Sequence, residues 1–183
     1  MFQELMTELA EKNIQNYPYS LSDIYDITNK ILTTVSFYPG HCATPVVKIA
    51  KAFGFVLYQE GMSDGQYGRL YIGNESIDKY GKEKTLVVNR NISKFQQRYM
   101  VALQLGNYLL KYLGTEKQLN FEQASKDEVL GQFVLELLMP RELFREQYLI
   151  ASKSGNPMFT ETYLSRYFEV PVTCVLNRIR SLT

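Results

Sequence analysis

The chain has 183 residues and a mass of 21.2 kDa, a length typical of one domain that buries roughly 70 % of its unfolded surface. Its 45 % hydrophobic and 21 % charged residues exclude collagen-like, low-complexity and wholly disordered chains. A net charge of +1 gives no support for nucleic-acid binding, because proteins that neutralise many phosphates carry a basic excess. We expect a cytoplasmic protein, because the two cysteines are widely separated and the N-terminal segment is acidic. We expect no membrane partner, because the sequence lacks a long apolar run.

The first part of the chain is expected to be helical. Apolar residues at helical spacing over residues 5–32 predict helix, with Ser22 and Asp23 placed to cap it. Further on, Thr44 followed by Pro45 is typical of a helix start, and Gly54 is the expected end of that helix.

Three short runs rich in β-branched and aromatic residues follow. They cover residues 55–58, 69–72 and 85–88, and glycine-containing turns separate them. We therefore expect a three-stranded antiparallel sheet.

The second half of the chain has the strongest helical periodicity. Residues 93–113 contain no proline and place apolar side chains three or four positions apart, which predicts a long helix. Further helices are expected over residues 127–139, 142–150, 160–168 and 171–182. The expected fold class is α+β, with a small antiparallel sheet packed with helices in a single domain over residues 1–183.

Three blocks of sequence occur in a fixed order. They read TLVVNRN…RYMVALQLGNYLL (85–110), DEVLGQFVLELLMP (127–140) and LSRYFEVPVTCVLNRI (164–179). In order and separation they resemble the ImmA/IrrE family of zinc metallopeptidases, which bacteria, their phages and mobile elements encode. The resemblance implies a zincin-like core over residues 44–150, preceded by a helical segment over residues 1–35 and followed by a helix pair over residues 160–182.

The chain departs from this family at the zinc-binding motif. On the family's pattern, His-Glu-x-x-His falls on Leu103, Gln104, Leu105, Gly106 and Asn107, so both imidazoles and the general base are missing. Leucine has no lone pair for a metal, and a glutamine amide is no base near neutral pH. The family's third ligand falls on Asp127, beside Glu128. We therefore expect no bound zinc, no other cofactor and no catalytic residue.

The resemblance also implies a biological role. Active family members relieve repression by cleaving helix-turn-helix repressors, so the leading hypothesis is an inactive pseudo-peptidase that binds a regulatory protein of the phage or mobile-element repressor type. One alternative is a metallopeptidase with rearranged ligands, for which His41, Cys42 and Asp127 are the candidates. Another is a DNA-binding regulator acting through residues 160–182. DNA binding is disfavoured, because the C-terminal segment has little basic excess.

Four residues are expected to contact the protein partner. Gln104 and Asn107 can donate and accept hydrogen bonds where the metal would lie, and Glu128 is close to the third ligand position. Tyr71, on an expected edge strand, is the candidate contact for an extended peptide added to the sheet. The cysteines Cys42 and Cys174 are expected to be inert buried residues.

Overall fold

The N-terminal segment forms two helices, α1 (Phe2–Ile14) and α2 (Leu21–Thr34), in a computed structural model that describes residues 2–35, 43–113 and 128–181. The helical prediction is confirmed, but the expected capping by Ser22 is wrong. Ser20 is the N-cap: its hydroxyl oxygen accepts from the Asp23 N–H at 3.2 Å, and the Asp23 carboxylate accepts from the Ser20 N–H at 2.9 Å. Asp23, the third residue of α2, thus completes a capping box with Ser20.

The sheet contains β1 (Val56–Glu60), β2 (Gly68–Ile72) and β3 (Lys84–Asn89) in the order β1-β3-β2. The three predicted strands are confirmed, but the fully antiparallel arrangement is wrong, because β1 pairs with β3 in parallel. β3 takes the central position since its residues Thr85–Asn89 are all buried, and a nearly continuous apolar run is typical of a strand covered on both faces.

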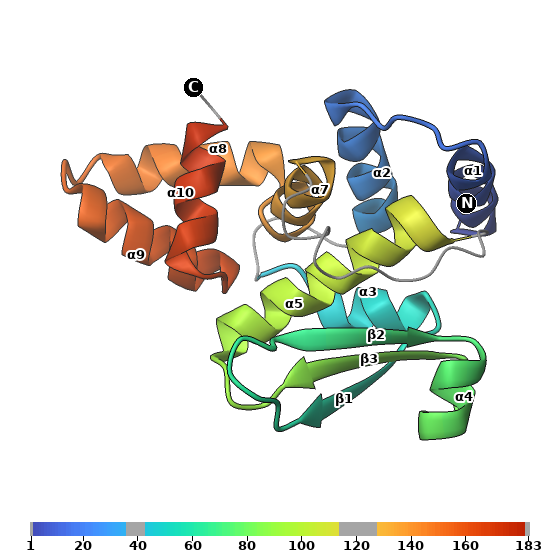
Figure 1. Ribbon diagram of the computed structural model, residues 1–183. Helices are drawn as coiled ribbons and strands as arrows, with labels where there is room; N and C mark the ends of the chain where they lie inside the picture. The colour runs from blue at the N-terminus through green and yellow to red at the C-terminus, as the bar shows by residue number, and fades with distance from the viewer. Residues whose placement is uncertain (1, 36–42, 114–127, 182–183) are drawn as a thin grey trace.

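Two helices cover one face of this sheet (Figure 1): α3 (Val46–Ala52) and α5 (Lys94–Asn107). α5 starts with a second capping box, formed by Ser93 and Gln96, and continues as a π-helical turn, η1 (Tyr108–Tyr112). The expected helix start at Thr44 is wrong by one residue: Pro45 is the N-cap. Thr44 is instead buried and its hydroxyl donates to the Leu137 carbonyl oxygen at 2.8 Å, which ties the start of α3 to a later helix.

A short helix, α4 (Asn74–Tyr80), lies at the end of the sheet and was not expected from the sequence. The remaining described helices are α7 (Glu128–Leu138), α8 (Arg141–Ser152), α9 (Pro157–Phe168) and α10 (Val172–Arg180). They agree with the predicted helices within a few residues. In Figure 1, α8, α9 and α10 lie at one end of the molecule and α1 at the other, with α5 between them. Among the described residues, no helix is both long and apolar enough to cross a bilayer.

The contact between α5 and α7 depends on the missing side chain of Gly106. A Cβ atom at this position would lie 2.5 Å from Phe133 Cδ1 and 2.8 Å from Leu130 Cδ1, both on α7. These distances are shorter than any carbon–carbon contact that packing allows. Glycine at position 106 therefore allows α7 to lie directly against α5.

A buried ion pair joins α7 to α10. Arg178 is 1 % exposed and donates from Nη1 and Nη2 to the two carboxylate oxygens of Glu136, at 2.9 and 2.7 Å. Arg178 also donates to the Met139 carbonyl oxygen, and Arg141 donates to Glu136 at 2.8 Å. Burial alone would raise the pKa of Glu136, but the two arginines outweigh it and hold this pKa below its usual value.

We predict that Gly106→Ala destabilises the fold by about 1–3 kcal/mol, because α7 must move or Phe133 must leave its place. Gly131→Ala, also in a helix, is the matched control: no atom lies within 4 Å of its added Cβ. This control should be neutral or stabilising by up to about 1 kcal/mol, as alanine is the better helix former. Urea unfolding measures both, and equal effects of the two substitutions would contradict the contact.

We predict that Glu136→Gln destabilises the fold by about 3–5 kcal/mol at pH 7, because it weakens the pairing of a buried arginine. Since the folded-state pKa of Glu136 is lowered, its contribution is complete above its unfolded pKa and is lost as the pH falls through the folded pKa. Between pH 7 and about pH 3.5, the free energy of unfolding should therefore fall by less in the variant than in the wild type. Glu142→Gln, on an exposed side chain, should leave this pH dependence unchanged.

Candidate functional site

The three residues that the family resemblance places on the zinc motif, Leu103, Gln104 and Asn107, lie in the C-terminal half of α5. Leu103 and Asn107 are one turn apart and therefore on the same side of the helix. Leu103 is half-buried and packs against the core, whereas Gln104 and Asn107 are 3 % and 1 % exposed. The structure thus brings these residues together beside the contact of α5 with α7.

The two amide side chains are buried without hydrogen bonds. Gln104 Oε1 and both polar atoms of the Asn107 side chain have no partner among the described residues. A buried polar group without a partner costs about 1–3 kcal/mol of stability. Such groups are uncommon in folded proteins and are a reason to look for a ligand or partner at that place.

The described residues at this place do not fit zinc. Zinc sites in proteins use thiolate, imidazole and carboxylate ligands, and α5 offers a leucine and two neutral amides. No group of three His, Cys, Asp or Glu side chains lies together within residues 2–35, 43–113 and 128–181. Glu128 is exposed at the start of α7, while the alternative ligands His41, Cys42 and Asp127 lie outside the described residues.

Tyr71 is not brought together with the two amides. Its hydroxyl accepts from Lys79 at 3.0 Å and its ring lies 5.2 Å from the ring of Tyr80, so it faces α4. The neighbouring strand position Leu70 belongs to the core, and successive strand residues point to opposite faces. Tyr71 is therefore on the face of the sheet away from α5.

The backbone of Tyr71 is also used within the sheet. β2 is an edge strand, as expected, and Tyr71 is paired with Thr85 of β3. The Asn89 N–H donates to the Tyr67 carbonyl, and hydrogen-bonded pairs recur at every second residue, so Tyr71 directs its N–H toward β3. The Tyr71 N–H is therefore not free to pair with a peptide added at this edge.

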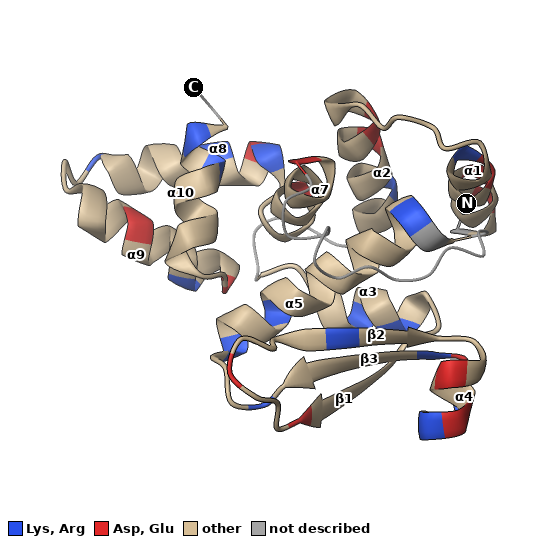
Figure 2. Cartoon of the chain, viewed as in Figure 1, with Lys and Arg blue, Asp and Glu red and all other residues tan. Residues whose placement is uncertain are grey.

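A groove that the sequence did not indicate lies on the other side of α5, between α3, α5 and β1. Its volume is about 510 Å³, and its lining residues are Val47, Lys51, Leu57, Tyr58, Gln59, Val88, Lys94, Phe95, Gln97, Arg98, Val101 and Glu169. Arg98 closes one end: it donates to the Thr44 carbonyl at 2.7 Å and its Nε lies 3.4 Å from Glu169 Oε2. One sequence signal could have pointed here, because α3 and α5 contain basic residues and no acidic residue (Figure 2).

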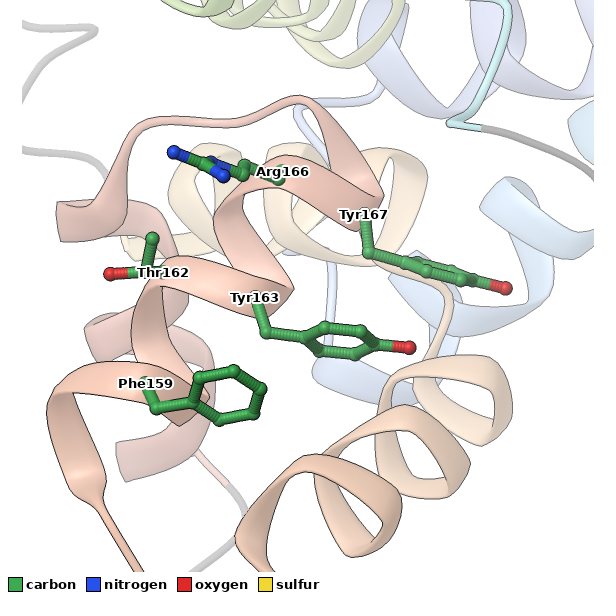
Figure 3. Close-up of a pocket in the computed structure, with 5 residues that line it drawn as sticks. All are labelled: Phe159, Thr162, Tyr163, Arg166 and Tyr167. Atoms are coloured by element: carbon green, nitrogen blue, oxygen red, sulfur yellow. The ribbon is translucent and has the colours of Figure 1, made fainter. Parts of the chain in front are cut away.

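A second pocket of about 400 Å³ lies on α9, where three aromatic rings are stacked (Figure 3). Phe159, Tyr163 and Tyr167 follow one another at four-residue spacing, with ring centroids 6.2 and 6.0 Å apart. Figure 3 shows the three rings on one side of the helix, and Arg166 pointing away from them. The Tyr163 hydroxyl donates to Gln147 of α8, so the rings partly serve the packing of α8 on α9.

The C-terminal helix pair gives little support to DNA binding. Arg178 is buried in the ion pair with Glu136, and Arg141 also bonds to that carboxylate. The buried Arg178 guanidinium is therefore not free to neutralise a phosphate, which removes one of the few basic residues in this part of the chain.

The thiol of Cys174 is expected to be unreactive. Cys174 is a free, buried thiol, and burial raises its pKa to about 11. Since the thiolate is the reactive form, Cys174 stays protonated and unreactive near neutral pH, as expected.

Comparison with known proteins identifies the family of this architecture. A family model, Peptidase_M78, described as the IrrE N-terminal-like domain, matches residues 50–180. This match runs from the end of α3 to the end of α10 and includes β1–β3, α5 and α7. No curated protein sequence matches the chain. The chain belongs to the Peptidase_M78 family of IrrE N-terminal-like domains.

Proposed function

We propose that this chain is a catalytically inactive member of its family, which binds a regulatory protein where active members bind zinc and substrate. The observation that carries the proposal is the pair of buried, unpartnered amides of Gln104 and Asn107 on α5. They stand where the family resemblance places the catalytic glutamate and a zinc ligand.

The chemistry of these amides suits a protein partner. An asparagine side chain offers one donor group and one acceptor, and the Gln104 Oε1 atom adds a second acceptor. A main-chain peptide group has the complementary N–H and C=O. Hydrogen bonds to a partner would therefore satisfy groups that are costly to leave unpaired in the free protein.

Leu103 marks the point of access. It is only half-buried, although its neighbours Gln104 and Asn107 are buried, and it lies on the same side of the helix as Asn107. A partner would reach the amides from this side, between α7 and β2, with small movements of the side chains that cover them.

The family resemblance suggests the kind of partner. Active relatives act on helix-turn-helix repressors, so we propose a repressor of this type, which the chain would hold without cleaving. A cytoplasmic location, a role in transcription regulation and an origin in a phage or mobile element belong to this proposal. The rival function, a metallopeptidase with ligands from His41, Cys42 and Asp127, makes the opposite prediction for zinc.

We predict that the purified protein, dialysed against a mild chelator, holds less than about 0.1 zinc per chain by elemental analysis. Leu103→His/Gln104→Glu/Asn107→His should gain zinc, because two imidazoles one turn apart meet a carboxylate from the start of α7. The single variant Leu103→His is the control and should stay metal-free. Stoichiometric zinc in the wild type would disprove the proposal, and a metal-free triple variant would show that these positions do not form the old site.

We predict that Gln104→Met and Asn107→Leu each raise the free energy of unfolding by about 1 kcal/mol, because each removes unpaired buried polar atoms. The same substitutions should weaken binding of a helix-turn-helix repressor from the same genome by about tenfold, as each removes hydrogen bonds to the partner. Calorimetric titration against a panel of such repressors measures this. Variants that are stabilised and still bind normally, or a panel in which no repressor binds, would overturn the proposed role of the amides.

A further inference from the structure

The groove between α3, α5 and β1 has an apolar interior. Leu57 of β1, Val88 of β3 and Val101 of α5 line it and belong to the core or pack against it. Phe95 and Val47 add apolar side chains from the two helices, and Val47 is 41 % exposed. Burial of such surface by a ligand is favourable at about 25 cal/mol per Å².

One wall of the groove is a strand with an unused edge. β1 pairs only with β3, and the Arg90 N–H donates to the Glu60 carbonyl oxygen at 2.9 Å. In a parallel pair, alternate residues point their backbone groups toward the partner strand. Glu60 therefore points toward β3, and Leu57 and Gln59 point their N–H and C=O groups outward. No described residue bonds to these four groups.

The side chains of Leu57 and Gln59 are on the same face as the groove. Both line it, and Gln59 Nε2 donates to Gln97 of α5 at 3.0 Å. Tyr58 stacks on Tyr80 of α4, on the opposite face of the sheet. A strand added at this edge would thus place every second side chain against α3 and α5.

The charges around the groove have one dominant sign. Lys51, Lys94 and Arg98 line it, and Glu169, which pairs with Arg98, is the one acidic residue among the described residues that line it. Lys51 and Lys94 are exposed, and neither has a hydrogen bond or ion pair with a described residue. The groove thus offers two ammonium groups that have no partner among the described residues, one on each helix, above an apolar interior.

We infer that this groove binds an extended acidic segment of a protein, added as a fourth strand to the free edge of β1. Backbone hydrogen bonds to Leu57 and Gln59 hold the segment, its carboxylates meet Lys51 and Lys94, and its apolar side chains fill the interior. The inference rests on the proposed function for the class of partner, a protein. Its test is separate from that of the amides, because neither Gln104 nor Asn107 is among the residues that line the groove.

A peptide suits this place better than a nucleic acid. Nucleic-acid sites combine several phosphate contacts with stacking on exposed aromatic faces. Among the described residues that line the groove, two are unpaired cations, and most of the apolar residues are aliphatic. Unpaired backbone donors and acceptors along an edge strand are complementary to a peptide main chain.

The test uses fluorescence anisotropy with a labelled peptide Glu-Thr-Val-Thr-Glu-Thr-Val-Thr, which places Glu and Val alternately on one face of a strand. The comparison peptide carries Lys in place of Glu. We expect saturable binding of the acidic peptide, about tenfold tighter than that of the basic one and weakened by salt. Lys51→Glu/Lys94→Glu should weaken the binding of the acidic peptide by about tenfold or more, whereas Lys48→Glu/Lys82→Glu, on exposed lysines outside the groove, should change it by less than about twofold.

A second pair of variants tests the strand addition. Gln59→Pro removes an outward N–H, and Gln59→Val keeps it; both lose the side-chain bond to Gln97. We expect the proline variant to bind the peptide about fivefold more weakly than the valine variant, with similar thermal unfolding. Equal binding by this pair, or by the wild type and the Lys51→Glu/Lys94→Glu variant, would overturn the inference, as would no saturable binding up to about 1 mM peptide.

Three further outcomes separate the hypotheses. A single-stranded oligonucleotide that binds more tightly than the peptide, and is lost in the Lys51→Glu/Lys94→Glu variant, would overturn the inference in favour of nucleic acid. A repressor that binds the wild type and this variant equally well, together with no saturable binding of the acidic peptide, would overturn the inference but leave the proposed function intact. Stoichiometric zinc in the wild type would overturn the proposed function, while the peptide titration would still decide the groove.

Discussion

The close contact of α5 with α7 at Gly106 is the constraint on which the rest of the structure depends. With a Cβ at this position, α7 could not lie where Phe133 and Leu130 pack against α5. α7 in turn holds two distant parts of the chain: its Leu137 carbonyl accepts from Thr44 before α3, and its Glu136 binds Arg178 of α10. The sheet, through α5, and the C-terminal helices, through α7, are thus joined by one helix pair whose spacing a single glycine permits.

The same contact holds in place the residues that the family resemblance assigns to the zinc motif. Leu103, Gln104 and Asn107 are held in position because α5 is fixed against the sheet on one side and α7 on the other. Because α5 is rigidly packed, the two buried amides can stay unpaired. The apolar packing around them offsets the loss of stability that they cause. In our proposal this rigid packing has kept a binding surface after the loss of the catalytic groups. Binding by hydrogen bonds needs neither a Lewis acid nor a base, so it does not depend on the residues that are absent.

The two sides of α5 are chemically different. Leu103 and Asn107 lie on the side away from the groove, where Asn107 carries a neutral amide, and the side toward β1 and α3 carries exposed lysines above apolar side chains. The charge of the whole chain, close to neutral, conceals this difference. The positive charge of Arg178 is paired with Glu136 inside the protein. The positive charges of Lys51 and Lys94 lie around the groove. Net charge therefore describes the average of the surface but not its local partners.

The sequence by itself determined the helices, the three strand segments, the family resemblance and the lack of imidazoles on α5. These follow from local patterns, namely apolar spacing and the residue types at motif positions, which act between near neighbours in the chain. It also contained the nearly continuous apolar run of β3, which is typical of a central strand, although the glycine-containing turns between the strands favoured a fully antiparallel sheet. Only the tertiary structure decided that β1 runs parallel to β3, that Tyr71 faces α4, that Arg178 is buried and that α3, α5 and β1 enclose a groove. These features join residues far apart in the chain, and strand order and burial depend on how all the elements pack together, which no local pattern encodes.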